Sequence, residues 1–225
     1  MENSSTVIRD LNLSAFHFIN KTFGHPAFNE AMNIINIMGE PHLFYYHLLI
    51  IAIIACILIY KERDDKSSLK ELSILGFSAI CTLGLSLIVS LLIITLPIKE
   101  YLNIARPYCS LDNINVLKST LEYTTCNQSF PSGHIAFSTI MITSFWPLFN
   151  RFFKTISISF IFILAISRIA SGAHYPMDLL GSVAFSLPIT LYIRDKMNIT
   201  IRYYEEKFNA FNYLYQRITR SKTSI

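Results

Sequence analysis

The chain has 225 residues, of which 52% are hydrophobic and only 15% are charged. Soluble globular proteins carry about 25% charged residues, so this composition argues against an ordinary soluble domain. The net charge of +4 needs no nucleic-acid partner, because membrane orientation and contact with anionic lipid headgroups account for it.

The first 42 residues precede the long apolar runs and are expected to form N-terminal interfacial helices. Residues 7–24 are ambiguous, because Asn12, Asn20 and Lys21 argue against a simple membrane span. Residues 26–38 begin with a proline and place apolar side chains at helical spacing. This pattern predicts a short helix that is either interfacial or packed against the bundle.

Five apolar runs follow, each close to the length of about 20 residues that crosses a bilayer as a helix. They are residues 43–60, 72–98, 134–150, 155–170 and 177–193. Only helices and closed barrels satisfy the backbone inside a bilayer, and these runs are too long for barrel strands. The sequence therefore predicts an all-α polytopic membrane bundle with five transmembrane helices. We expect a single domain, residues 1–225, with its transmembrane core at 43–194.

The distribution of Lys and Arg predicts the orientation, because these residues are retained on the cytoplasmic side. If the runs alternate in direction, thirteen of them fall on one side: Lys61, Arg63, Lys66, Lys70, Arg151, Lys154, Arg194, Lys196, Arg202, Lys207, Arg217, Arg220 and Lys222. The opposite side carries Lys99, Arg106, Lys118 and Arg168. We therefore expect an integral protein of a bacterial inner membrane. The side of the protein with few cations, which carries Lys99, Arg106 and Arg168, would face the periplasm.

The C-terminal tail, residues 195–225, is then cytoplasmic and amphipathic. Its apolar side chains are spaced four and three residues apart: Tyr204, Phe208, Phe211, Tyr215 and Ile218. This stripe indicates a helix that lies in the membrane interface, with a dimer contact as the alternative. The oligomeric state stays open.

The four cysteines fall into two pairs. Cys56 and Cys81 lie inside apolar runs and are expected to pack as small residues. Cys109 and Cys126 share the outer connection between the second and third runs, where an oxidising compartment would allow a disulfide. The sequence leaves this pairing open. A metal site is disfavoured, because neither cysteine has closely spaced His or Cys partners.

The first chemical motif, residues 99–107, contains Lys99 and Arg106 just past the second run. On one helix they would share a face about 10.5 Å apart along the axis, and Pro107 would end that helix. Taken alone, two such cations are better explained as anchors to lipid headgroups.

The second motif, residues 131–134, begins the third run. Ser132 or a neighbour can cap the helix, and Gly133 lets the backbone approach a ligand closely. The free N–H groups of a helix start attract anions, and His134 would lie beside such an anion. An ordinary helix cap with an incidental histidine is the alternative.

The third motif covers residues 167–178. Arg168 is a cation near the end of an apolar helix, which is costly unless the arginine has a partner or a function. Asp178 follows His174 by four residues, so it can reach an imidazole nitrogen and set the tautomer. The alternative is a structural pair that links two helices.

Together, the motifs Lys-x6-Arg-Pro, Pro-Ser-Gly-His and Ser-Arg-x5-His-x3-Asp resemble those of the type 2 phosphatidic acid phosphatase superfamily, at every signature position and in the same order. This superfamily includes lipid phosphate phosphatases and vanadium haloperoxidases. The resemblance implies a six-helix lipid phosphatase core and a phosphatase that needs no metal and no other cofactor.

The resemblance also implies roles for the motif residues. His174 would attack phosphorus and form a phosphohistidine, while Asp178 orients and activates it. His134 would protonate the leaving oxygen and then activate water. The phosphate-binding residues would be Lys99, Arg106, Ser132, Gly133 and Arg168.

The resemblance does not choose the substrate, which we expect to be a membrane lipid phosphate. Gly133 and the complete Lys99 motif favour a phosphomonoester such as phosphatidylglycerophosphate, phosphatidic acid or a lipid A phosphate. Undecaprenyl pyrophosphate hydrolysis and lipid phosphotransfer are alternatives within the same chemistry. A transporter or scaffold without catalysis is the alternative of another class.

Overall fold

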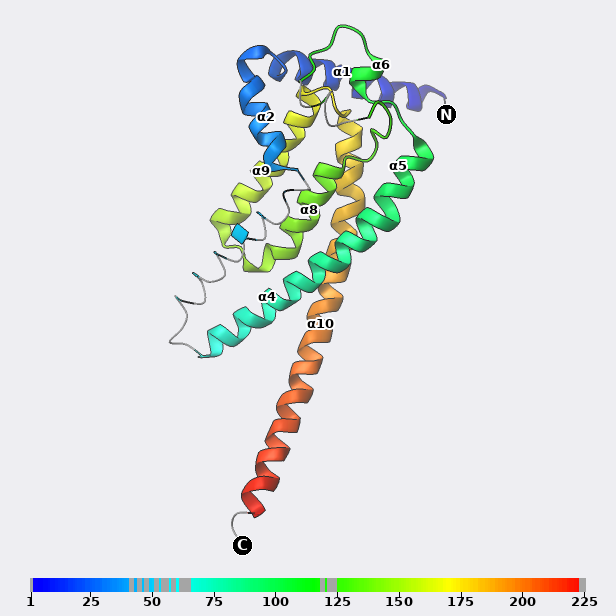
Figure 1. Cartoon of the computed structure of the whole chain (residues 1–225). Coiled ribbons are helices and arrows are strands. Elements are labelled where there is room, and N and C mark those ends of the chain that lie inside the picture. The colour runs from blue at the N-terminus through cyan, green and yellow to red at the C-terminus, as the bar shows by residue number, and fades with distance from the viewer. Residues whose placement is uncertain are drawn as a thin grey trace.

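The computed structural model describes residues 2–40, 66–117 and 125–222, together with the single residues 43, 46, 49, 50, 53, 57, 60 and 120. Within these residues all regular secondary structure is helical. The bundle consists of α4 (Lys66–Leu87), α8 (Gly133–Phe145), α9 (Arg151–Ala170) and α10 (Pro176–Lys222). At one end of it lie α1 (Glu2–Phe23) and α2 (Asn29–Met38), as Figure 1 shows.

Three of the described helices are long and apolar enough to cross a membrane, over Leu69–Ser90, Arg151–Ala170 and Pro176–Asn209. They correspond to the second, fourth and fifth expected spans. The first expected span, residues 43–60, lies outside the described residues apart from single positions. The chain is thus an all-helical protein with three helices of membrane-spanning length in its described part.

The third expected span, residues 134–150, is shorter in the structure. Helix α8 has 13 residues, about 20 Å, and a 3₁₀ turn, Trp146–Leu148, follows it. The α-helix ends just before Pro147, because proline has no backbone N–H to continue the helical hydrogen bonds; Trp146 stays in the αR conformation and its N–H bonds to Thr143 O. Nine of the 13 residues of α8 are buried against α4, α9 and α10, so α8 is the core helix of the bundle.

The second expected span is part of one long, continuous helical segment. Helix α4 continues through a π-helical segment, Ile88–Thr95, into α5 (Leu96–Leu102). This helical segment ends where Asn103 adopts a left-handed conformation with φ 43°. Lys99 is therefore carried to the end of the bundle where α8 and α10 begin.

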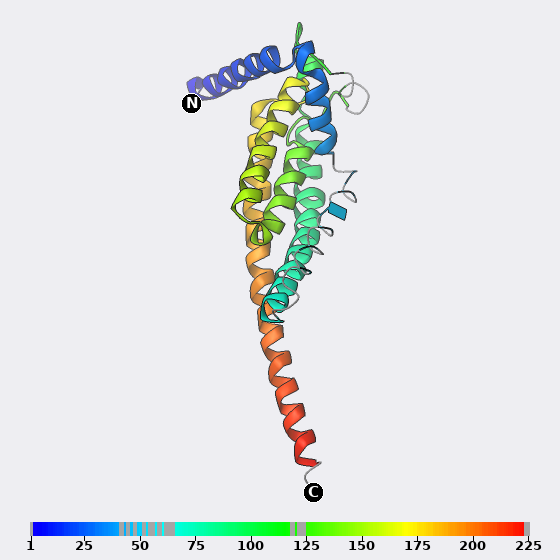
Figure 2. The same cartoon turned by 90° about the vertical axis from the view of Figure 1, so that its left-hand side faces the viewer.

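Helix α1 does not run along the bundle but lies across its end (Figures 1 and 2). The buried side chain of Asn20 donates to Asn115 O (2.8 Å) and Ala170 O (2.9 Å), and it accepts from Asn115 N (2.9 Å). Asn12 Oδ1 accepts from Met177 N at 3.0 Å, in the first turn of α10. The two asparagines that argue against a span thus fix α1 to the ends of α9 and α10.

Helix α10 has 47 residues and is about 70 Å long, more than twice the thickness of about 30 Å of a bilayer core. The fifth expected span and the expected tail are one helix without a break at residue 195. Ion pairs Arg202–Glu71 (2.6 Å) and Lys70–Glu205 (2.5 Å) fasten it to the start of α4. Beyond these pairs the helix projects from the bundle, as Figure 2 shows.

The connection between α5 and α8 is closed by a disulfide between Cys109 and Cys126, whose Cα atoms are 5.6 Å apart. Cys109 lies in a one-turn helix, α6 (Pro107–Ser110). The backbone N–H of Arg106 donates to Cys126 O at 2.8 Å. The disulfide therefore connects the two backbone segments that hold Arg106.

We expect the double change Cys109→Ser, Cys126→Ser to destabilise the folded chain. Closing a loop of this size stabilises by about 3 kcal/mol in the chain-entropy model. Thermal unfolding of the detergent-solubilised protein should show a lower midpoint for the double variant and for the reduced wild type. Cys81→Ser is the control, because Cys81 is a free cysteine. Equal midpoints for the oxidised and reduced wild type would contradict this expectation.

Candidate active site

The three sequence motifs meet at the end of the bundle that α1 and α2 cover (Figure 1). The first motif lies on α5 and the loop after it, and the second lies at the start of α8. The third spans the end of α9, a tight turn and the start of α10. Three motifs that are distant in the sequence therefore share one end of the fold.

Lys99 and Arg106 do not share a helix face, so the expected helix through both residues is wrong. Helix α5 ends at Leu102, and Arg106 lies in extended backbone with ψ 154°, directly before Pro107. The proline disfavours the α conformation at Arg106, which turns the chain away from the helix axis. This loop carries the guanidinium of Arg106 into the buried end of the bundle.

The guanidinium of Arg106 contacts the first of the two histidines. Its Nη1 atom lies 3.1 Å from His174 Nε2 and donates to Ala173 O at 3.1 Å. A guanidinium has only donors, so His174 Nε2 must accept and carry its lone pair on this side. The proton of the neutral ring is then on Nδ1, which lies 3.4 Å from Asp178 Oδ2.

The carboxylate of Asp178 is held from two further sides. Its Oδ2 atom accepts from Ser129 Oγ at 2.5 Å and from the backbone N–H of Tyr175 at 2.8 Å. Asp178 lies in the first turn of α10, where the helix dipole favours a negative charge. The geometry thus orders a chain of groups from Ser129 through Asp178 and His174 to Arg106.

Arg168 is buried in the last turn of α9, with only 4% of the residue exposed. Its Nη1 atom donates to Asn36 Oδ1 of α2 at 3.3 Å, and Ser167 Oγ donates to the same oxygen at 2.7 Å. The carbonyl of Arg168 accepts from the N–H groups of Ala173 and His174. Helix α2 therefore fixes Arg168 from the side, and Arg168 in turn shapes the His174 turn.

His134 lies in the first turn of α8, and its Nε2 atom is 2.9 Å from Glu40 Oε1, just past α2. Ser132 occupies the N-cap position, but its hydroxyl makes no capping bond and has no hydrogen-bond partner in the described part of the chain. An added Cβ at Gly133 would meet no atom within 4 Å. The start of α8 thus presents a buried hydroxyl and open space beside its free N–H groups.

The cations of this end affect one another and the histidine. Burial, and then the charge of Arg106, lowers the pKa of Lys99 to about 8. Burial also lowers the pKa of Arg106. The pKa of His174 is held well below its usual value, first by burial and then by the charges of Arg106 and Arg168. His174 is therefore a neutral imidazole at neutral pH.

Three residues of this site carry no motif signal in the sequence: Asn36, Glu40 and Ser129. Asn36 is a polar residue within the apolar stripe of residues 26–38, and this is the one sequence feature that could have pointed to its role. The structure shows that Asn36 is buried. Glu40 and Ser129 reach the site only because of how the chain folds.

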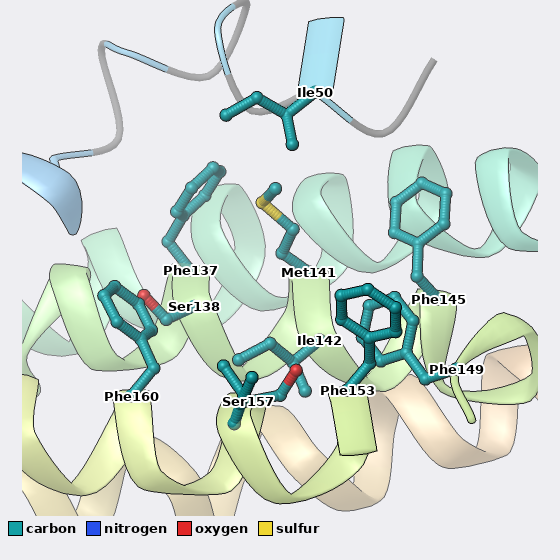
Figure 3. Close-up of a pocket in the computed structure, with 11 residues that line it drawn as sticks. Ile50, Phe137, Ser138, Met141, Ile142, Phe145, Phe149, Phe153, Ser157 and Phe160 are labelled. Carbon is teal, nitrogen blue, oxygen red and sulfur yellow. The ribbon is translucent and has the colours of Figure 1, made fainter. Parts of the chain in front are cut away.

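A cavity of about 310 Å³ lies between α8 and α9, and Figure 3 shows the side chains that line it. It begins at Phe137, one turn after His134, and continues past Met141 to Phe153. Its lining is apolar apart from Ser138 and Ser157, and Ile50 closes one side. An apolar cavity thus starts one helical turn from a site histidine.

The model of the PAP2 superfamily matches residues 79–199, which is more than half of the chain and includes all three motifs. Among solved structures the fold resembles LpxE from Aquifex aeolicus, with a TM-score of 0.57 and 21% identity over 81% of this chain and 94% of that chain. It is also similar to the first transmembrane PAP2 type phosphatidylglycerolphosphate phosphatase from Bacillus subtilis, with a TM-score of 0.46 and 22% identity over 87% of this chain and 86% of that chain. No curated protein sequence matches. The resemblance of the three motifs is confirmed, and the chain belongs to the PAP2 superfamily.

Proposed function

We propose that the chain hydrolyses the phosphate ester of a membrane lipid through a phosphohistidine. The observation that carries this proposal is the Arg106–His174–Asp178 contact series, which leaves the Nε2 lone pair of His174 as the nucleophile. Arg106 donates to that lone pair in the structure. An arriving phosphate, as a stronger acceptor for the guanidinium, would draw Arg106 away and free Nε2 for attack.

In the first step, His174 Nε2 attacks phosphorus and the bond from phosphorus to the lipid oxygen breaks. The electron pair of that bond goes to the lipid oxygen, which takes a proton from His134. Asp178 stabilises the positive charge that develops on the His174 ring. The products are the lipid alcohol and a phosphohistidine.

In the second step, His134 takes a proton from a water molecule whose oxygen attacks phosphorus. The bond from phosphorus to nitrogen breaks, and its electron pair returns to His174 Nε2. Inorganic phosphate leaves. His134 thus acts as an acid in the first step and as a base in the second.

The phosphoryl oxygens would be held by Lys99, Arg106, Arg168, the Ser132 hydroxyl and the N–H of Gly133. Two buried donors among these residues, Ser132 Oγ and Arg168 Nε, have no hydrogen-bond partner in the described part of the chain. Buried donors without partners are costly, so they favour a ligand rich in acceptors. Fixed cations and donors of this kind are the main protein contribution to phosphoryl transfer, and we propose that no metal is needed.

The apolar cavity favours a lipid over a soluble phosphate ester. It lies along α8 on the C-terminal side of His134, where one acyl chain could extend while the phosphate stays at the start of the helix. Phosphatidylglycerophosphate, phosphatidic acid and lipid A phosphates are the candidate substrates. Undecaprenyl pyrophosphate hydrolysis and lipid phosphotransfer remain alternatives.

The charge distribution supports a site that faces away from the cytoplasm. Arg151 at the start of α9 and Lys70 near the start of α4 lie at the bundle end opposite to the motifs. If all five expected spans cross the membrane, this distribution favours basic connections in the cytoplasm, and we propose that the site faces the periplasm from an inner membrane.

Replacing the nucleophile tests the enzyme proposal. We expect His174→Ala to lower phosphate release from short-chain phosphatidic acid by about 10³-fold or more, because the covalent route is lost. The assay contains a chelator, and the wild type should keep its activity in it. His25→Ala is the control, because His25 is exposed. Equal release by the wild type and His174→Ala would refute the enzyme, and release only with an acceptor lipid would favour the phosphotransferase.

The lowered pKa of Lys99 predicts an alkaline limit. Lys99 is charged below its pKa of about 8 and neutral above it, so phosphate binding should weaken as the pH rises through this value. We expect kcat/KM to fall above about pH 8, since this parameter reports the free enzyme. Lys99→Arg keeps its charge and should shift the decline to higher pH. An unchanged profile in Lys99→Arg would show that another group titrates.

Filling the cavity should select against long acyl chains. We expect Met141→Trp to raise KM for long-chain lipid phosphates by about tenfold, because excluding two methylene groups costs about 1.6 kcal/mol. Hydrolysis of p-nitrophenyl phosphate, which has no acyl chain, should change little. Ile158→Trp is the control, because Ile158 is an exposed residue of α9 outside the cavity. Equal effects on both substrates would place the acyl chain elsewhere.

A further inference from the structure

The second histidine of the site has a carboxylate partner that no motif contains. Glu40 Oε1 lies 2.9 Å from His134 Nε2, and the two side chains are only 23% and 13% exposed. Glu40 follows Gly39 at the end of α2. The sequence separation of this pair is large, so the contact depends on how α2 packs.

The packing of α2 against α9 explains why Glu40 is in reach. Asn36, one turn before Glu40, accepts hydrogen bonds from Ser167 and Arg168, and Ser167 Oγ also donates to Met32 O at 2.9 Å. A Cβ at Gly39 would collide with the side chain of Leu164, so this glycine lets α2 end close against α9. These contacts deliver the Glu40 carboxylate to the start of α8.

The contact determines which nitrogen of His134 is available. A carboxylate only accepts, so Nε2 carries a proton toward Glu40, and Nδ1 is left for the reacting oxygen. His174 has the opposite arrangement, with Nδ1 toward Asp178 and Nε2 toward the substrate. Each histidine of the site thus has its own carboxylate and uses a different nitrogen.

The charged groups around His134 show why the Glu40 carboxylate matters for protonation of its ring. The charged groups that act on its ring are Arg168 from α9, Arg106 from the loop before α6, and Glu40 after α2, while His174 is a titratable neighbour from the turn before α10. Burial first, and then the charges of the two arginines, disfavour a protonated ring, and Glu40 is the group that opposes them.

We propose that Glu40 is a positioning residue that holds His134 Nε2–H, so that His134 gives and takes the catalytic proton at Nδ1. The inference rests on the phosphohistidine mechanism proposed above. In the first step the Nδ1 proton goes to the lipid oxygen that leaves, and in the second Nδ1 takes a proton from water. The Nε2 proton stays toward the Glu40 carboxylate throughout, at the ion-pair distance of 2.9 Å.

The test compares leaving groups that need a proton with one that does not. A lipid alkoxide must be protonated as it leaves, whereas p-nitrophenolate leaves without help. We expect Glu40→Gln to lower kcat for phosphatidic acid by about 10- to 100-fold, part of the 10²- to 10⁴-fold that general acid catalysis contributes, with little change in KM. With p-nitrophenyl phosphate the same variant should release about one p-nitrophenolate per enzyme in a fast burst, before slow turnover.

The p-nitrophenolate burst distinguishes a positioning role of Glu40 from a role in folding alone. Loss of folding would slow both steps and give no burst, whereas loss of His134 function slows phosphoenzyme hydrolysis after p-nitrophenolate has left. Glu40→Asp keeps the carboxylate and should recover most of kcat. Glu30→Gln, at an exposed carboxylate of α2, the helix that precedes Glu40, is the control and should behave as the wild type. An unchanged kcat in Glu40→Gln, or an equal loss on both substrates without a burst, would overturn the proposal.

A measurement on the wild type does not depend on any variant that fails to fold. Nitrogen NMR of the full chain with labelled histidine, followed over pH, should show His134 gaining and losing its proton at Nδ1 while Nε2 stays protonated, and the neutral His174 ring protonated at Nδ1. The opposite tautomer of His134 would overturn the inference. If the wild type itself forms no phosphohistidine, the proposed function fails, and this result is distinct from a wild type that turns over while Glu40→Gln is unaffected.

Discussion

The burial of several cations at one end of a helical bundle is the constraint on which this structure depends. Arg106 and Arg168 are almost fully buried, and Lys99 is close enough to Arg106 for burial and that charge to lower its pKa. Like charges in such a place repel and lose hydration, so they persist only with acceptors around them. Backbone carbonyls, the Asn36 amide and the Asp178 carboxylate supply part of these acceptors. A bound phosphate would supply the rest.

Helix ends rather than helix faces build this site. The start of α8 contributes free N–H groups, the start of α10 stabilises Asp178, and the turn after α9 presents His174. Such termini offer unpaired backbone groups without any cost in helical hydrogen bonds. The buried Asn20 of α1 and Asn36 of α2 hold the end of α9, and Asn12 of α1 contacts the start of α10, so these ends are fixed without a ligand.

In the proposed function, the same helices would hold both the phosphate and the lipid part of the substrate. Helix α8 carries His134 at its start and lines an apolar cavity along its side (Figure 3). A phosphate at the helix start and an acyl chain in the cavity would bind to one rigid element. The long helix α10 joins this end to the opposite end of the bundle, where Glu205 and Arg202 pair with α4.

The all-helical class, the apolar helices and the family were predictable from the sequence, because run length and three short motifs act locally along the chain. The rest was decided by tertiary structure, in part together with local effects of proline. The length of α8 and the loop position of Arg106 depend on Pro147 and Pro107 in their packed context. The contact of Glu40 with His134 joins segments far apart in sequence, so no local pattern encodes it. It exists because α2 packs on α9, and such packing is a property of the whole fold.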